Sequence, residues 1–317
     1  MKWRRSHEKY PLYECPVVTT EVDKPGVPSA AEPKSEVATL LVSCVDRHGL
    51  VAALAQVLTG HGANILAADQ HRNEQANQFF QRIRFDLSEL LTDRGTLERA
   101  LGEVAKRFGM DLRIFYDSDR PRVAIFVSQY DHCLYDLLWR HQSGELPCSI
   151  PLVISNRPDL APVAKHMGIP FVVYPITKEN KVEQEARELE LLEQHRIDLV
   201  VLARYMQILS PSFVNQYRNR IINIHHSFLP AFAGGKPYHQ AAERGVKLIG
   251  ATAHYATAEL DEGPIIEQDV IRTSHKDSIG DLIRKGRDVE RSVLGRAVRW
   301  HLEHRVLVHQ NRTVVFD

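Results

Sequence analysis

The sequence predicts an α/β protein of two folded units behind a short leader, and three observations lead to this prediction. The 317 residues exceed the roughly 50–250 residues of most single domains, so two domains are expected. Short apolar runs alternate with segments of helical spacing along most of the chain. A polar, proline-containing stretch at residues 117–122 separates two such series and marks the boundary between the units.

The composition excludes several classes of protein. Hydrophobic residues make up 44% and charged residues 25%, which is ordinary for a soluble globular protein. Because 40 Lys and Arg balance 40 Asp and Glu, the chain lacks the positive excess of a nucleic-acid binder. No apolar run reaches the roughly 18–20 residues that cross a membrane. The four cysteines are scattered, which favours free thiols in the cytoplasm over disulfides or a metal site.

Residues 1–36 are predicted to be a flexible leader. The segment begins with basic residues, but no apolar stretch follows them, which excludes a secretory signal. Glu8, Glu14 and Glu21 weigh against an organellar transit peptide. Prolines between Pro25 and Pro33 interrupt any hydrophobic period, so no regular element is expected there.

Residues 37–118 are predicted to form the first unit. A run rich in β-branched residues at 37–45 predicts a strand, and Leu50, Leu54 and Leu58 then recur at helical spacing. The remaining elements follow as strands at 63–68 and 79–87, a helix at 97–108 and a strand at 110–116. This β-α-β-β-α-β order is the ferredoxin-like pattern.

Two segments of this unit, 46–51 (Asp-Arg-His-Gly-Leu-Val) and 62–65 (Gly-Ala-Asn-Ile), resemble the ACT domain, a regulatory module that often binds amino acids. The N-terminus of a helix exposes backbone N–H groups that can bind a carboxylate. The resemblance implies a regulatory site at Asp46, His48, Gly49, Leu50, Asn64 and Ile65. The alternative is that the turn is only a tight connection in a module that dimerises.

Residues 119–317 are predicted to form the second unit. Short apolar runs at 123–128, 152–155, 171–174, 199–203 and 221–224 are typical of buried parallel strands. Helical segments lie between them, including 182–194, and a long amphipathic segment covers 278–301. Repeated β-α-β units predict a doubly wound, mostly parallel, Rossmann-like sheet that binds its ligand at the carboxyl ends of the strands.

Three polar residues are the candidates for chemistry. Asn223 and His225 alternate along one strand, so both side chains are expected on the same side, whereas His226 is expected on the opposite, structural side. Asp261 lies in a turn between two further strands. An amide that binds an oxyanion, an imidazole that moves protons and a carboxylate that orients it suit acyl-group chemistry. Each residue also has a purely structural interpretation, as a satisfied histidine or a turn residue.

The motifs Asn223-x-His225, Leu229-Pro230 and 260–266 resemble the signature of the folate-dependent formyltransferases. The resemblance implies that Asn223, His225 and Asp261 are catalytic. It also implies that a stretch similar to 202–210 holds the folate pteridine through its backbone. The candidate binding residues are Arg204, Met206, Gln207, Ile208 and Leu209, together with His254, which either lines the pocket or packs in the sheet.

The first strand-to-helix turn of the second unit departs from the transferases that use glycinamide ribonucleotide. Those enzymes have a glycine-rich loop there, whose N–H groups hold the phosphate of the acceptor. Residues 128–138 contain no glycine here, and Asp131 and Asp136 would repel a phosphate. Asp131 is also expected to cap the following helix. Water then remains as the formyl acceptor.

The ACT-like unit, the altered turn, and the segments 128–134, 237–241 and 244–255 together are similar to the formyltetrahydrofolate deformylases. This resemblance implies hydrolysis of 10-formyltetrahydrofolate to formate and tetrahydrofolate, which balances the folate pool and supplies formate for purine synthesis. Folate is then the substrate, with no cofactor and no metal. The resemblance also implies methionine or glycine as effectors, and a homo-oligomer because ACT modules pair.

Two other functions stay open from the sequence. One is a transferase that moves the formyl group to an amine acceptor, and the other is a regulatory protein that binds folate without turnover. A metal site at His301, Glu303, His304 and His309 is disfavoured because the spacing is loose. These residues are expected to be a solvated helix end.

Overall fold

The computed structural model describes residues 36–231 and 237–317. The predicted leader, residues 1–36, lies outside the described residues except for Glu36. Among the described helices, none combines the length and the apolar character that spanning a membrane requires.

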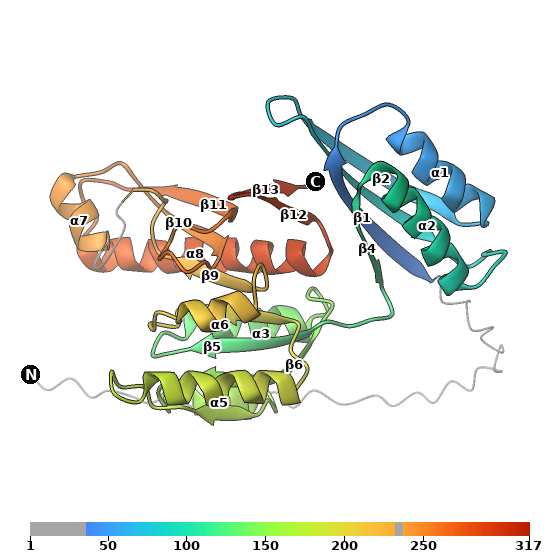
Figure 1. Cartoon of the computed structure of the whole chain (residues 1–317). Helices are drawn as coiled ribbons and strands as arrows, with labels where there is room; N and C mark the ends of the chain where they lie inside the picture. Colours follow the sequence, from blue (N-terminus) through green and yellow to red (C-terminus); the bar gives the residue numbers. More distant parts are fainter. Residues whose placement is uncertain (1–35, 232–236) are drawn as a thin grey trace, which may run out of the picture. The chain divides into compact units, whose positions relative to one another are not determined.

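The first unit forms a four-stranded antiparallel sheet with two helices. Its elements are β1 (Val37–Val45), α1 (Leu50–Gly60), β2 (Asn64–Asn73), β3 (Gln78–Asp86), α2 (Arg94–Phe108) and β4 (Asp111–Tyr116). The strands are ordered β2-β3-β1-β4, and α1 and α2 lie together on one face (Figure 1). The predicted order of elements is confirmed. β2 extends beyond the predicted 63–68. The prediction ended too early because the rest of this exposed edge strand shows no alternation of apolar and polar residues.

The second unit contains a seven-stranded, mostly parallel sheet, which confirms the predicted class. Its strands are β5 (Arg122–Val127), β6 (Ser149–Ser155), β7 (Phe171–Val173), β8 (Leu199–Leu202), β9 (Ile221–His225), β10 (Leu248–Tyr255) and β11 (Ile265–Arg272). They are ordered β11-β10-β9-β8-β5-β6-β7, and β10 pairs in antiparallel fashion with both of its neighbours, β9 and β11, whereas the other pairs are parallel. A hairpin of β12 (Val306–His309) and β13 (Arg312–Val315) follows.

Helices cover both faces of this sheet. They are α3 (His132–Gln142), α4 (Ala161–His166), α5 (Lys181–Gln194), α6 (Pro211–Gln216), α7 (Pro237–Arg244) and α8 (Ile279–Leu302). Alternation along β5 sends Ile125 to the core under α3, α4 and α8, and Phe126 to the core under α5 and α6. α8 runs along β9, β10 and β11 (Figure 1). Ser278 and Asp281 form a capping box at its start.

The topology explains where a site can form. β5, β8 and β9 are neighbours and run parallel, so the loops that follow them emerge at one edge of the sheet. The loop after β8 contains residues 203–210, and β9 ends at His225. Polar side chains from segments far apart in the sequence therefore converge at the carboxyl ends of these strands.

Candidate active site

A cavity of about 600 Å³ opens at this edge of the sheet. The residues predicted for catalysis and binding all line it: Arg204, Met206, Gln207, Ile208, Leu209, Asn223, His225, His254 and Asp261. They come from the loop after β8, from β9, from β10 and from the turn before β11. The structure therefore brings together in one cavity the two groups of residues that the motifs singled out.

The turn that carries Asp261 is held tightly against β10. Asp261 has a φ of 60°, a left-handed conformation that is uncommon for a residue with a side chain. The N–H of Tyr255 donates to the carbonyl of Pro264 at 2.9 Å. A Cβ at Gly263 would collide with the carbonyl oxygen of Tyr255, so only glycine lets the turn approach this closely. Strained backbone of this kind is concentrated at functional sites.

His225 and Asp261 form a buried pair. Nδ1 of His225 lies 3.2 Å from a carboxylate oxygen of Asp261, and His225 is only 6% exposed. Burial opposes ionisation of Asp261, but hydrogen bonds from His225 and His254 hold the pKa of its carboxyl well below the usual range. The carboxylate is therefore ionised and orients the imidazole. Nε2 of His225 is buried without a protein partner, so it is the nitrogen left to act on a substrate.

His254 orients the amide of Asn223. The two residues face each other across β10 and β9, and Nδ2 of Asn223 lies 3.2 Å from Nε2 of His254. Nδ1 of His254 lies 3.0 Å from the carbonyl oxygen of Tyr255. Because a carbonyl only accepts, Nδ1 carries a proton, and Nε2 faces both the amide of Asn223 and, at 3.7 Å, a carboxylate oxygen of Asp261. The second amide hydrogen of Asn223 is then available to an oxyanion. His254 therefore belongs to the site rather than to core packing alone.

The loop after β8 rests on buried polar groups. The hydroxyl of Tyr205 donates to Glu188 at 3.0 Å, and the N–H of Ser210 donates to Glu185 at 3.0 Å. The N–H of Met206 donates to the hydroxyl of Ser128 at 3.0 Å, so this backbone group is already engaged. These bonds hold the loop in a fixed shape.

The side chains of the same loop divide between cavity and core. Met206 and Ile208 are 50% and 59% exposed, which excludes core packing for them. Leu209 is buried in the core under α5 and α6. The loop therefore presents an apolar surface to the cavity that a flat, partly apolar ligand can contact.

Two protein families match the chain. The formyl transferase family matches residues 121–298, and the ACT domain family matches residues 38–109. A formyltetrahydrofolate deformylase from Synechocystis sp. is 58% identical over 279 residues, which are 88% of this chain and 98% of that protein. One from Bacillus subtilis is 50% identical over 279 residues, which are 88% of this chain and 93% of that protein. The chain belongs to the formyltetrahydrofolate deformylase family.

Solved structures agree with this assignment to the deformylase family. A formyltetrahydrofolate deformylase from Pseudomonas syringae pv. tomato matches with a TM-score of 0.87 and 48% identity, over 89% of this chain and 95% of that chain. Glycinamide ribonucleotide transformylase 1 from Symbiobacterium toebii matches with a TM-score of 0.60 and 30% identity, over 64% of this chain and 97% of that one. The deformylase thus matches far more of the chain than the transformylase does.

The predicted regulatory residues lie in the ACT part of this deformylase-family chain, at the start of α1 and along β2. Gly49 is the N-cap of α1 with a φ of 88°, and no side chain caps the helix. His48, Gly49 and Asn64 are exposed, whereas Leu50 is buried beside Cys44 and Phe79. The N–H groups at this helix end therefore face an open surface.

Several cavity residues were missed or misread in the sequence. His226 was expected to face away, but it lines the cavity, with its ring 5.2 Å from the ring of His225. The alternation rule fails there because β9 ends at His225. Burial lowers the pKa of His226 to about 4, so it is neutral. Tyr130, His132, Tyr238 and Glu290 also line the cavity, and none of them was predicted as a site residue, although the first three lie in segments that resemble the deformylases.

The structure confirms one further expectation only in part and shows that another was wrong. Asp131 does occupy the N-cap of α3, but its side chain makes no capping hydrogen bond. His301 does not belong to a solvated helix end, because its Nδ1 lies 2.7 Å from the buried hydroxyl of Tyr255. Burial lowers the pKa of His301 to about 4, which makes the imidazole a neutral acceptor for that hydroxyl.

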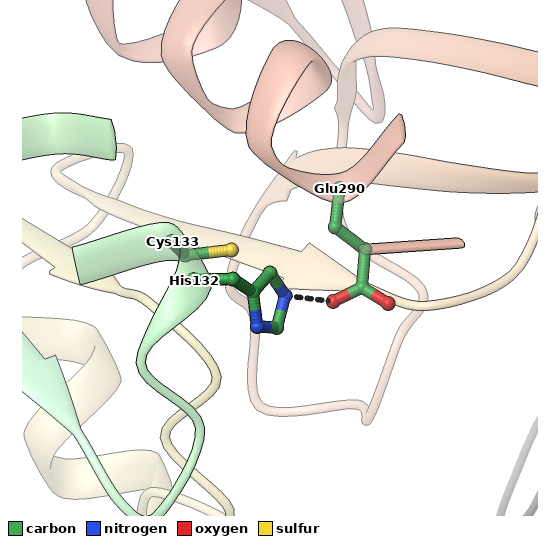
Figure 2. A group of neighbouring side chains, drawn as sticks. All are labelled: His132, Cys133 and Glu290. Carbon is green, nitrogen blue, oxygen red and sulfur yellow. Dashed lines mark hydrogen bonds and ion pairs between the residues drawn. The ribbon is translucent and has the colours of Figure 1, made fainter. Parts of the chain in front are cut away.

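His132, Cys133 and Glu290 are close enough to suggest a metal centre, since their potential ligand atoms lie within 4.8 Å of one another (Figure 2). The chemistry of the group does not fit a cation. The guanidinium of Arg204 already lies 3.4 Å from Glu290, and His132 and Tyr238 bond to its two oxygens. Burial raises the pKa of the Cys133 thiol, which keeps the sulfur protonated.

Proposed function

We propose that this chain hydrolyses 10-formyltetrahydrofolate to formate and tetrahydrofolate. The observation that carries the proposal is the buried His225–Asp261 pair beside an oriented Asn223 in a cavity of about 600 Å³. The names of the relatives point to the same substrate. Folate is the substrate rather than a cofactor, and the proposed chemistry uses no metal.

The reaction uses one water molecule, which gives one proton to N10 and releases a second one as the product ionises to formate. Asp261 and His225 position the water, and His225 accepts a proton as the water oxygen attacks the formyl carbon. The amide of Asn223 and the protonated imidazole stabilise the tetrahedral oxyanion. The intermediate then collapses, the carbon–N10 bond breaks, and the proton passes to N10. Met206 to Leu209 hold the pteridine, and Arg204 and His254 complete the wall of the pocket.

The proposal extends to the ACT part and the assembly. An amino acid, methionine or glycine, binds at Asp46, His48, Gly49, Leu50, Asn64 and Ile65. The exposed N-terminus of α1 supports a carboxylate ligand there. Val45, Val51 and Leu66 are 45%, 42% and 51% exposed around the turn, which supports a homo-oligomer that covers this surface.

The remaining proposals concern the setting of the reaction. The boundary between the units lies at residues 118 and 119, after a leader of 1–36. The enzyme works in the cytoplasm, in agreement with free thiols at Cys44, Cys133 and Cys148 among the described residues. Its formate supplies purine synthesis, and its hydrolysis balances the one-carbon folate pool.

The direct test is formate release from 10-formyltetrahydrofolate without an added acceptor, in the wild type and in Asp261→Ala. The wild type is expected to release formate and tetrahydrofolate in equal amounts. The variant is expected to bind folate with nearly unchanged affinity and to lose hydrolysis, because His225 loses its orienting carboxylate. Full activity of Asp261→Ala would overturn the role given to this residue.

Two other functions make different predictions in the same assay. A transferase would release formate only when an amine acceptor is absent or slow, and would form a formylated amine when one is supplied. A folate-binding regulatory protein would bind the substrate and release nothing, with or without methionine or glycine. The catalytic geometry favours the hydrolase because a pure binder needs no His–Asp pair.

A further inference from the structure

Four polar side chains from four separate elements meet inside the cavity, apart from the proposed catalytic residues. Glu290 of α8 is 1% exposed and lies at their centre. Nε2 of His132 at the start of α3 lies 2.8 Å from one carboxylate oxygen, and the hydroxyl of Tyr238 in α7 donates to the other at 2.6 Å. Arg204 lies 3.4 Å from Glu290. Figure 2 shows the His132 ring turned toward the Glu290 carboxylate. These four residues are called the Glu290 cluster.

The carboxylate of Glu290 is held by donors on both of its oxygens. A buried carboxylate is strongly disfavoured unless donors surround it, and here both oxygens of Glu290 are occupied. The hydrogen bond from His132 and the charge of Arg204 overcome the effect of burial and lower the pKa of Glu290, so the carboxylate is ionised. Within the cluster, Nδ1 of His132 and Nε of Arg204 are buried without a hydrogen-bond partner.

Two backbone features show that the chain is shaped to build this cluster. Arg204 has a φ of 62°, and its guanidinium is held over the ring of Tyr130 at 4.8 Å. A side chain in this left-handed region persists only where its surroundings hold it. Gly286 lies on α8 where a Cβ would collide with the hydroxyl of Tyr238, so glycine is needed for Tyr238 to reach Glu290.

His226 contacts both the catalytic pair and the cluster. The ring of His226 lies 5.2 Å from the ring of His225 and 6.0 Å from the ring of Tyr238. His132 and Arg204 line the same cavity as Asn223 and Asp261. An acceptor larger than water that approached the formyl group from this side would meet the side chains of the cluster.

We propose that the Glu290 cluster determines the specificity of the reaction by filling the space that an amine acceptor would need, which reserves the formyl group for water. This inference rests on the proposed hydrolysis, and it gives Arg204 a role in specificity besides its place in the wall of the pocket. His132 belongs to the strand-to-helix turn that differs from the phosphate-binding loop of the transferases, and its imidazole forms one side of the Glu290 cluster.

The test measures how the formyl group divides between water and hydroxylamine, an amine small enough to diffuse into the site. Attack by its nitrogen on the formyl carbon breaks the bond to N10, sends a proton to N10 and gives N-hydroxyformamide. The paired variant Arg204→Gly with Glu290→Ala removes one positive and one negative charge, so no buried charge loses its partner. We expect its ratio of N-hydroxyformamide to formate, corrected for the uncatalysed reaction, to rise at least about tenfold over the wild type.

The ratio is independent of how much active protein is present, so a merely structural role would not move it. Tyr238→Phe, which keeps the ring and leaves the charges of Arg204 and Glu290 paired, is the matched control and should stay near the wild-type ratio. If the paired variant does not fold, His132→Ala takes its place with the same expected direction. An unchanged ratio in a folded, active variant overturns the cluster's role alone. Absence of formate from the wild type overturns the proposed function instead.

Discussion

The cavity of the proposed active site and the ACT turn differ in how deeply their polar residues are buried and in what those residues contact. In the cavity, His225 and His254 are 6% and 2% exposed, and each contacts polar partners from other elements. At the ACT turn, His48 and Asn64 are exposed, and Asp46 pairs with an Arg72 whose side chain is 56% exposed. The polar groups of the cavity are therefore held in place by protein partners, whereas those of the turn are open to solvent.

The largest effect on formate release is expected at the buried His225–Asp261 pair of the cavity. His225→Gln removes the proton acceptor but retains the size of the side chain. Formate release should fall by about 10²–10⁴ fold, which is the usual contribution of acid–base catalysis. Folate affinity, measured by calorimetry, should change little. Activity within tenfold of the wild type would show that His225 is not the proton acceptor.

The next effect concerns the close approach that places Asp261. Gly263→Ala would force the turn away from β10, because its Cβ would meet the carbonyl oxygen of Tyr255. A displacement of about 1 Å can cost roughly 10²-fold in rate, so a comparable loss of formate release is expected. Gly280→Ala is the matched control, since its Cβ would make only an ordinary contact at 3.6 Å. Equal activity of the two variants would contradict the packing argument.

A third prediction concerns stability beneath the loop that lines the cavity. Burial raises the pKa of Glu188 to about 7, against roughly 4.3 for an unfolded glutamate. The folded state therefore retains a proton that the unfolded state loses, and the free energy of unfolding falls as pH rises from about 4 to 7. Glu188→Gln removes this titration and should stabilise the protein by about 3 kcal/mol above pH 7.

Denaturant unfolding of both proteins at pH 5 and pH 8 measures this effect. The two stabilities should be closer at pH 5, where the native carboxyl is largely protonated, and should separate at pH 8. A difference that is independent of pH would mean that Glu188 does not titrate in this range. Tyr205 retains a hydrogen-bond acceptor in the variant, so loss of that bond does not confound the comparison.

The smallest effect on catalysis is expected at the exposed turn. Asp46→Ala removes a side chain that contacts Arg72. Both residues are far in the sequence from those that line the cavity. Without amino acids its formate release should fall far less than that of His225→Gln. The response of the rate to methionine or glycine should be lost. An unchanged response would remove Asp46 from the regulatory site.

Much of the fold followed from local patterns. The apolar runs at 123–128 and 199–203 predicted β5 and β8 because strands buried on both faces are continuously hydrophobic. α5 and α8 were predicted from their apolar spacing and are present at 181–194 and 279–302. Asn223 and His225 could be placed together because β-strand alternation is strict within an element.

The remainder depended on contacts that no local pattern encodes. His132 and Glu290 are far apart in the sequence and meet only because α3 and α8 pack on the same face of the sheet. His226 was misassigned because strand geometry stops at the residue before it. The hydrogen bond between His301 and Tyr255 likewise joins a helix end to a strand. Such partners become visible only when the tertiary structure is known.

The central claim is that water takes the formyl group, and an isotope experiment tests it most directly. The wild-type protein is supplied with 10-formyltetrahydrofolate in water enriched in oxygen-18, with no amine added, and the formate is analysed by mass spectrometry. Each formate should contain one oxygen from the solvent, and tetrahydrofolate should form in equal amount. Formate without solvent oxygen, or loss of the formyl group with no formate, would contradict the account.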